Sequence, residues 1–164
     1  MDLSSFYGLI AGTCFTLVGL WWTVLGKRED WKRDWKMRKL AGGTYLSFLI
    51  PGLMATFAQV APTTPLLWRF TFAISALLGI ASTLVLLRVD SGGHKGPFRS
   101  NRWIVVVLYA AITVFAVAPE LAQPVGLTAL QVASLLLIGL ILIGHGLTWE
   151  FLMSPADDAD AVQQ

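Results

Sequence analysis

The chain has 164 residues, of which 55% are hydrophobic and 13% are charged, and its formal net charge is +2. This composition is more apolar than that of ordinary soluble domains. The single cysteine, Cys14, excludes an internal disulfide, and we expect no nucleic-acid binding, because a basic loop beside a membrane helix is explained by topology and by anionic lipid headgroups.

Five apolar segments are each long enough to form a membrane-crossing helix. They are residues 6–25, 40–60, 66–87, 103–121 and 127–152. A hydrocarbon core about 30 Å thick needs about 20 apolar residues per helix, and backbone polar groups in lipid must be bonded within the segment. We therefore predict an all-α fold, a five-helix transmembrane bundle within residues 1–154, followed by a disordered acidic cytoplasmic tail at 155–164.

Basic residues predict the orientation of the bundle. Eleven of the twelve lysines and arginines lie in or beside the loops that follow the first and third segments. By the positive-inside rule these loops lie in the cytoplasm, which puts the N-terminus outside and the C-terminus inside. We expect a protein of a bacterial plasma (inner) membrane whose first segment stays as an anchor, because its flanking charges follow it.

Small residues in the first, third and fifth segments predict close helix packing. In lipid, association depends on close approach, which glycine allows. Such packing lies either within one subunit or between subunits of a homo-oligomer. The candidate packing residues are Gly8, Gly12, Gly19, Gly79, Gly139 and Gly146.

The loop after the first segment carries Trp31 and Trp35, one helical turn apart, among charges that include Lys32 and Arg33. This pattern predicts a short interfacial helix, with indoles at headgroup depth and basic groups in water. It is either an ordinary membrane anchor or a helix that senses lipid or docks a partner.

The second segment contains Pro51-Gly52 near its middle. Proline removes the amide that would bond the carbonyl of Ser47, so the helix is expected to kink there. The kink is either a gate hinge or a purely structural bend.

Charged residues at membrane depth are costly unless they are paired or hydrated. Arg69, early in the third segment, and Glu120, late in the fourth, are predicted at the same outer end. We expect them to form an ion pair, which either clamps the two helices together or lines an outer charged vestibule.

The fifth segment places His145 between two glycines, with Glu150 five residues later. A histidine there is a candidate pH sensor or gate, or a hydrogen-bonded structural residue. Five residues correspond to about 140° around a helix, so these two side chains are not expected to share a face.

Recognised catalytic signatures are missing from the sequence: it has no HExxH, GxSxG or phosphate-loop pattern, and two histidines and one cysteine predict no metal or haem site. We expect no cofactor and no enzyme activity. The leading interpretation is a small oligomeric ion channel or small-solute transporter with a kinked second helix. The alternative is a membrane scaffold, sensor or accessory subunit that binds a cytoplasmic protein partner or anionic lipid through its basic loop.

Overall fold

The computed structural model describes residues 2–60, 64–89 and 97–153, and these residues form helices without any strand. The predicted acidic tail lies outside the described residues. The elements are α1 (Leu3–Lys27), α2 (Glu29–Arg33), α3 (Trp35–Ala58), α4 (Pro65–Val89), α5 (Pro97–Ser100), α6 (Trp103–Val117), the 3-10 helix η1 (Pro119–Val125) and α7 (Ala129–Met153).

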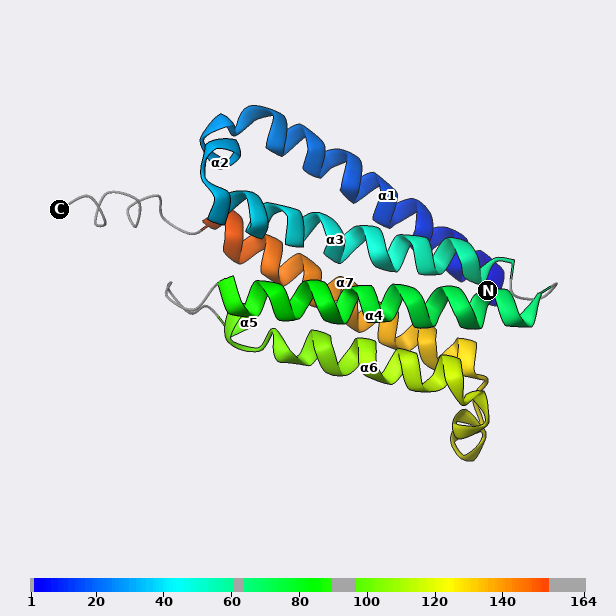
Figure 1. Cartoon of the computed structure of the whole chain (residues 1–164). Helices are drawn as coiled ribbons and strands as arrows, with labels where there is room; N and C mark the ends of the chain where they lie inside the picture. The colour runs from blue at the N-terminus through cyan, green and yellow to red at the C-terminus, as the bar shows by residue number, and fades with distance from the viewer. Residues whose placement is uncertain (1, 61–63, 90–96, 154–164) are drawn as a thin grey trace.

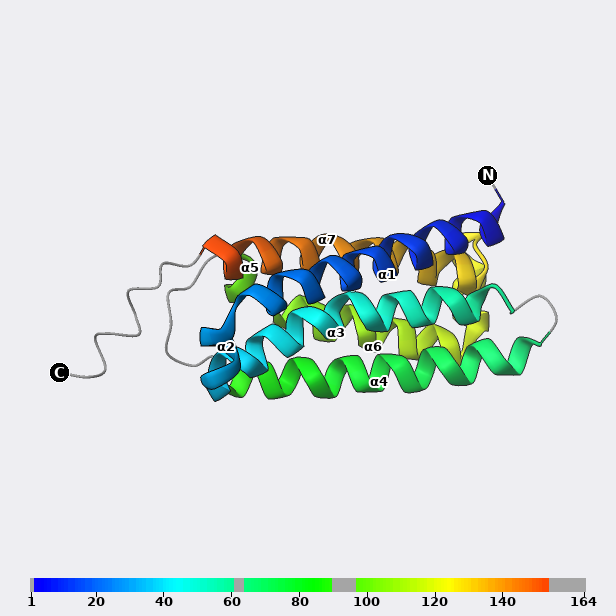
Figure 2. The same ribbon diagram turned by 90° about the horizontal axis from the view of Figure 1, so that it is seen from above.

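Helices α3, α4, α6 and α7 form a ring in which each helix packs against two neighbours, and α1 packs on the outside of this ring against α3 (Figure 1). Seen from above, α1 runs between α3 and α7 (Figure 2). Its early turns are tied to α7 by the hydroxyl of Tyr7, which donates a hydrogen bond to the carbonyl of Leu130 at 2.7 Å.

Four helices, α1, α3, α4 and α7, are long and apolar enough to cross a membrane. Large apolar side chains on their outer faces are exposed, including Leu9, Phe70, Leu78, Leu135 and Leu142. In water such a surface would be a liability, whereas in lipid it is the expected exterior. The structure therefore indicates an integral membrane protein.

The fourth predicted segment is shorter than expected. Helix α6 ends at Val117 rather than continuing to residue 121, and η1 follows it. Pro119 lacks an amide, and it also disfavours helical backbone at Ala118, whose ψ of 74° ends the helix. The 15 residues of α6 span about 22 Å, which is less than the hydrocarbon thickness.

The two ends of the bundle differ. Helices α2 and α5, which belong to the two predicted basic loops, lie at one end, called here the basic end (Figure 1). The start of α1, the end of α3, the start of α4, and η1 lie at the opposite end (Figure 1). The described parts of both basic loops thus lie at one end of the bundle, which is what the predicted topology requires.

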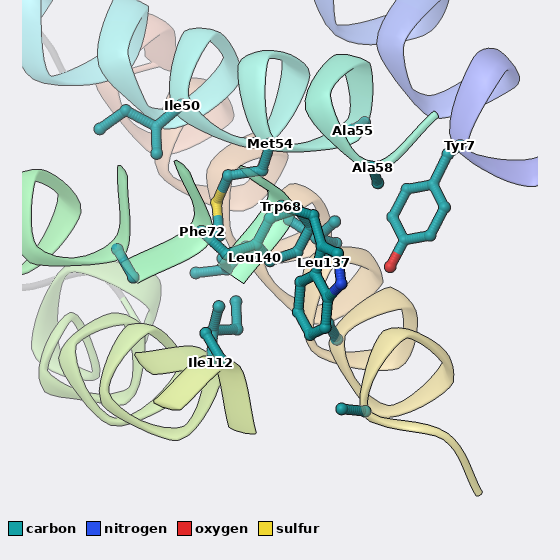
Figure 3. Close-up of a cluster of buried hydrophobic side chains, with 14 of the residues drawn as sticks. Tyr7, Ile50, Met54, Ala55, Ala58, Trp68, Phe72, Ile112, Leu137 and Leu140 are labelled. Atoms are coloured by element: carbon teal, nitrogen blue, oxygen red, sulfur yellow. The ribbon is translucent and has the colours of Figure 1, made fainter. Parts of the chain in front are cut away.

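The helices meet in a tightly packed apolar core, drawn in Figure 3. Met54 of α3, Phe72 of α4, Ile112 of α6 and Leu137 of α7 have no exposed surface. Contacts of this kind supply the close packing on which helix association in lipid depends. This layer closes the centre of the four-helix ring.

Candidate functional site

A cavity with polar side chains in its wall lies between α3, α4, α6 and α7, near the basic end. Its volume is about 50 Å³. A buried water needs about 10–15 Å³, so the cavity has room for a few waters or for one small ion with water. Among its lining residues, the polar side chains are Thr44, Ser47, Ser82, Thr83, Arg102 and Tyr109.

Arg102 gives this cavity its charge. The residue stands at the start of α6, and its side chain is only 8% exposed. Arginine stays protonated under all ordinary conditions, and a charge at membrane depth persists only where it is paired, hydrated or functional.

The hydroxyl groups around the cavity are tied to their own helices. On α3, the Ser47 hydroxyl donates to the carbonyl of Thr44 at 2.7 Å. On α4, the hydroxyls of Ser82 and Thr83 both donate to the carbonyl of Gly79, at 3.0 and 2.8 Å. Because the protons point along the helices, the oxygen lone pairs remain as acceptors, and rotation of a hydroxyl would turn a donor toward a bound group.

Tyr109 reaches the cavity because α4 carries a glycine opposite it. A Cβ at Gly79 would lie 2.5 Å from the tyrosine ring, far closer than carbon atoms can approach. Gly79 therefore leaves the space that the ring of Tyr109 occupies.

Arg69 lies at the opposite end, where it joins α4 to α6. Its Nε donates to the carbonyl of Ala116 at 2.8 Å and its Nη2 to the carbonyl of Val117 at 2.5 Å. These carbonyls belong to the last turn of α6, where backbone acceptors lack helical partners. The two helices are clamped as predicted, but the predicted partner is wrong: no ion pair joins Arg69 to Glu120, whose side chain is exposed.

Pro51 and Gly52 lie within a helix that is continuous from Trp35 to Ala58. Both residues are buried. A Cβ at Gly52 would lie 2.9 Å from the Cβ of Cys14, so this glycine allows the close approach of α1 to α3. The predicted hinge function of the pair stays a prediction.

His145 and Glu150 have separate environments on α7. The Nδ1 of His145 donates to the carbonyl of Ile141 at 2.8 Å, and the ring meets Phe48 edge-on, with centroids 5.2 Å apart. Glu150 instead accepts the backbone amide of Phe98 at 2.8 Å and so ties α5 to α7. Neither residue lines the cavity.

The two loop tryptophans differ in burial. Trp31 is 9% exposed and packs with Trp21 and Phe151 in a cluster that joins α1, α2 and α7, which we call the aromatic cluster. The prediction of a lipid-facing indole at Trp31 is therefore wrong, because the end of α7 covers it. Trp35 is 58% exposed and lies under the ammonium of Lys39, 5.0 Å from the ring centroid.

Lys32 and Arg33, on α2, are exposed beside the aromatic cluster. The segment that carries them is helical, as predicted, but it is broken at Asp34. This residue caps α3 by accepting the amide of Lys36 at 2.8 Å. The basic groups of the segment thus surround a short turn rather than one continuous interfacial helix.

The candidate packing glycines fall into two groups. Gly79 lies against Tyr109, Gly146 against Phe98 and Gly139 against Leu108, while a Cβ at Gly8 would meet only Gln59. A Cβ at Gly12 or Gly19 would meet nothing within 4 Å. These last two glycines lie on the exposed outer face of α1, so their predicted packing has no partner within the described part of the chain.

Metal binding has no support in the described residues, where no three histidine, cysteine, aspartate or glutamate side chains come close enough to hold an ion. The chain matches no protein-family model, and no curated protein or solved structure is detectably similar to it.

Proposed function

We propose that the protein is a small ion channel or small-solute transporter, whose path enters the four-helix ring at the basic end. The observation that supports this most is the cavity itself. Polar side chains are costly inside a membrane protein and commonly mark a substrate or ion pathway. Here Arg102 and five hydroxyl-bearing residues from three helices surround one space.

The positive-inside rule supports a cytoplasmic location for the basic end. The cavity would then open toward the cytoplasm, and the apolar layer of Met54, Phe72, Ile112 and Leu137 would close the outward route. The described conformation would be a closed one, with the solute site on the inner side of the barrier.

Helix α3 is proposed to open this barrier. It contributes Ser47 to the cavity and Met54 to the apolar layer, and Pro51 lies between them. Because Pro51 cannot donate to the carbonyl of Ser47, the helix lacks one hydrogen bond at the position where a bend would move Met54. Broken or weakened helices of this kind surround the binding sites of many transporters.

The proposal is tested by flux into liposomes combined with thiol labelling. Thr83→Cys places a thiol in the cavity, and Thr16→Cys places one on the exposed outer face of α1 at membrane depth. The native Cys14 is buried and serves as the background. A charged methanethiosulfonate reagent added from water should label Thr83→Cys and block flux, while it leaves Thr16→Cys unlabelled and active.

Two outcomes would overturn the proposal. One is the absence of flux for water, halides, small carboxylates and small neutral solutes in liposomes that contain folded protein. The other is flux that persists unchanged after complete labelling of Thr83→Cys, because a solute that passes a blocked cavity does not use it.

A membrane scaffold, sensor or accessory subunit is the second candidate, and the outer face of α1 favours it. Gly12, Gly19 and Gly26 lie seven residues apart, and a Cβ added at any of them would meet nothing within 4 Å in the described part of the chain. Such a face suits another helix in lipid, from a second copy of the chain or from a different subunit. Purification in native lipid with one dominant partner, together with no flux, would favour this candidate.

A further inference from the structure

The side of α3 that faces away from the bundle carries charged and aromatic residues that the proposed path does not use. Trp35, Lys39 and Gly42 follow one another at intervals of four and three residues, so they share one face of the helix. Arg38 lies beside Lys39 and is also exposed. Thr44 lies about two and a half turns after Trp35, so the cavity that it lines is on the opposite side of α3. We call Trp35, Arg38, Lys39 and Gly42 the outer α3 face.

The segment around this face is positively charged. Residues 27–39 contain seven lysines and arginines against three aspartates and glutamates, so four positive charges remain in excess. The ammonium of Lys39 lies 5.0 Å from the centroid of the Trp35 ring, which belongs to the preceding helical turn. The lysine side chain therefore extends toward the basic end and carries its charge out of the apolar region, as lysines do at membrane interfaces. Positive charge and an exposed indole thus meet at the depth of the lipid headgroups.

Further from the basic end, part of α3 is uncovered. A Cβ added at Gly42 would meet nothing within 4 Å in the described residues. In the next turn, Tyr45 packs edge-on against Trp22 of α1, with ring centroids 5.7 Å apart, and Trp22 is 60% exposed. The open backbone at Gly42 therefore lies, along the helix, between two basic side chains and an aromatic wall.

We propose that the outer α3 face binds an anionic phospholipid of the surrounding membrane. Arg38 and Lys39 bind the headgroup phosphate, because charge-assisted hydrogen bonds from a guanidinium and an ammonium are strong and suit its oxygens. The glycerol and the start of an acyl chain lie over Gly42, against the ring of Trp22.

This site differs from the lipid contact that the sequence predicted. Trp31 is buried in the aromatic cluster, whereas Trp35 stays exposed on α3. An acidic protein would match the charges as well, but an open helix backbone beside an exposed aromatic ring at membrane depth suits a lipid chain. The binding is independent of whether the protein transports a solute.

Binding is tested by tryptophan quenching in liposomes of phosphatidylglycerol and phosphatidylcholine in equal amounts. In one preparation the phosphatidylglycerol chains are brominated, and in the other the phosphatidylcholine chains, so the two differ only in which lipid quenches a nearby indole. We expect brominated phosphatidylglycerol to quench more, with a preference of about fivefold, the contribution of one basic group near anionic lipid. Trp22→Phe should remove most of this selective quenching. Trp149→Phe, which removes another exposed indole from outside the site, should keep it.

Two double variants separate a site from a general attraction of the loop for anionic lipid. Arg38→Gln with Lys39→Gln should lower the preference to near one. Lys32→Gln with Arg33→Gln removes the same charge from exposed positions on α2 and should keep most of the preference. Gly42→Leu keeps every charge but fills the open space, so it should also lower the preference. It should fold, because leucine favours a helix more than glycine does and has room there.

The inference is overturned if the two brominated lipids quench the native protein equally. It is also overturned if the two double variants lose the preference equally, because the loop then attracts anionic lipid through its total charge alone. Selective quenching that survives in Trp22→Phe and disappears in Trp149→Phe would place the lipid elsewhere. A protein partner that depends on Arg38 and Lys39, found without any lipid preference, would assign this face to an acidic protein instead.

Discussion

Substitutions at Arg69 and Glu120 test whether Arg69 stabilises the fold through the backbone carbonyls of α6 or through the ion pair that the sequence suggests. Arg69 donates two hydrogen bonds to backbone carbonyls, at 2.8 and 2.5 Å. A hydrogen bond that involves a charged group contributes about 1.5–3 kcal/mol when buried. One of these bonds is exposed, so we expect Arg69→Gln to lower the free energy of unfolding by about 2 kcal/mol rather than by the full sum.

Reversible unfolding in mixed micelles, followed by tryptophan fluorescence, measures this change. Arg69→Lys should recover about half of the loss, because an ammonium keeps the charge but lacks the two-pronged donor geometry. Glu120→Gln is the matched control and should change stability by less than about 0.5 kcal/mol, as is usual for an exposed side chain. Exchanging the two charges, Arg69→Glu with Glu120→Arg, should not restore stability. Restoration by the exchange, or a loss in Glu120→Gln equal to that in Arg69→Gln, would refute the carbonyl clamp.

Other contacts give predictions that the same measurements check. Gly79→Ala should destabilise by about 1–3 kcal/mol through overlap with the ring of Tyr109, whereas Gly12→Ala, with free space around it, should be neutral or stabilising; equal effects would contradict the packing described. Trp31→Ala should cost about 3 kcal/mol by emptying the aromatic cluster, and an unchanged midpoint would mean that the indole faces lipid after all. The amide of Ser5 donates to the Asp2 carboxylate and lowers its pKa in the folded protein. The stabilisation by this cap is therefore complete above the pKa of the unfolded chain, about 3.9, and is lost as the pH falls through the lower pKa of the folded protein. A carboxyl resonance that titrates at or above about 3.9 would contradict it.

The helices themselves were predictable because the membrane requirement is local. A crossing segment must satisfy its own backbone and be apolar along its length, and both properties can be read from a short stretch of sequence. The end of α6 was placed too late, at residue 121, because Ala118 and Leu121 keep the average hydropathy high around Glu120, although Pro119 interrupts the helical backbone. A local rule about proline was in this case stronger than the hydropathy pattern.

The clamp at Arg69 was predicted between the correct pair of helices, but its acceptors were not. A sequence displays side-chain charges, so Glu120 was the visible partner. Every helix ends in backbone carbonyls that lack helical partners, whatever its side chains are, so the sequence does not show which of them an arginine will bond. Only the position of α4 relative to that end decides which acceptors Arg69 reaches.

The cavity was missed for a related reason. Arg102 was counted among the loop cations that set the topology, and nothing in its immediate neighbours indicates that α3, α4 and α7 cover it. A partial signal did exist: Thr44 and Ser47 are three residues apart on α3, and Ser82 and Thr83 lie at the same end of the antiparallel α4. Hydroxyls clustered at one depth in adjacent helices would have pointed to a polar space.

The position of the cavity also constrains how any solute could cross. Beyond the hydroxyl lining, the centre of the ring is filled by Met54, Phe72 and Ile112, none of which is exposed. A charged solute cannot pass such a layer, since the transfer of a charge from water into an apolar interior is prohibitive. Transport therefore requires the layer to part. Helix α3 contributes to the cavity wall on one side of Pro51 and to the barrier on the other side. If flux is found while α3 stays rigid, the route must lie between subunits, along the small-residue face of α1.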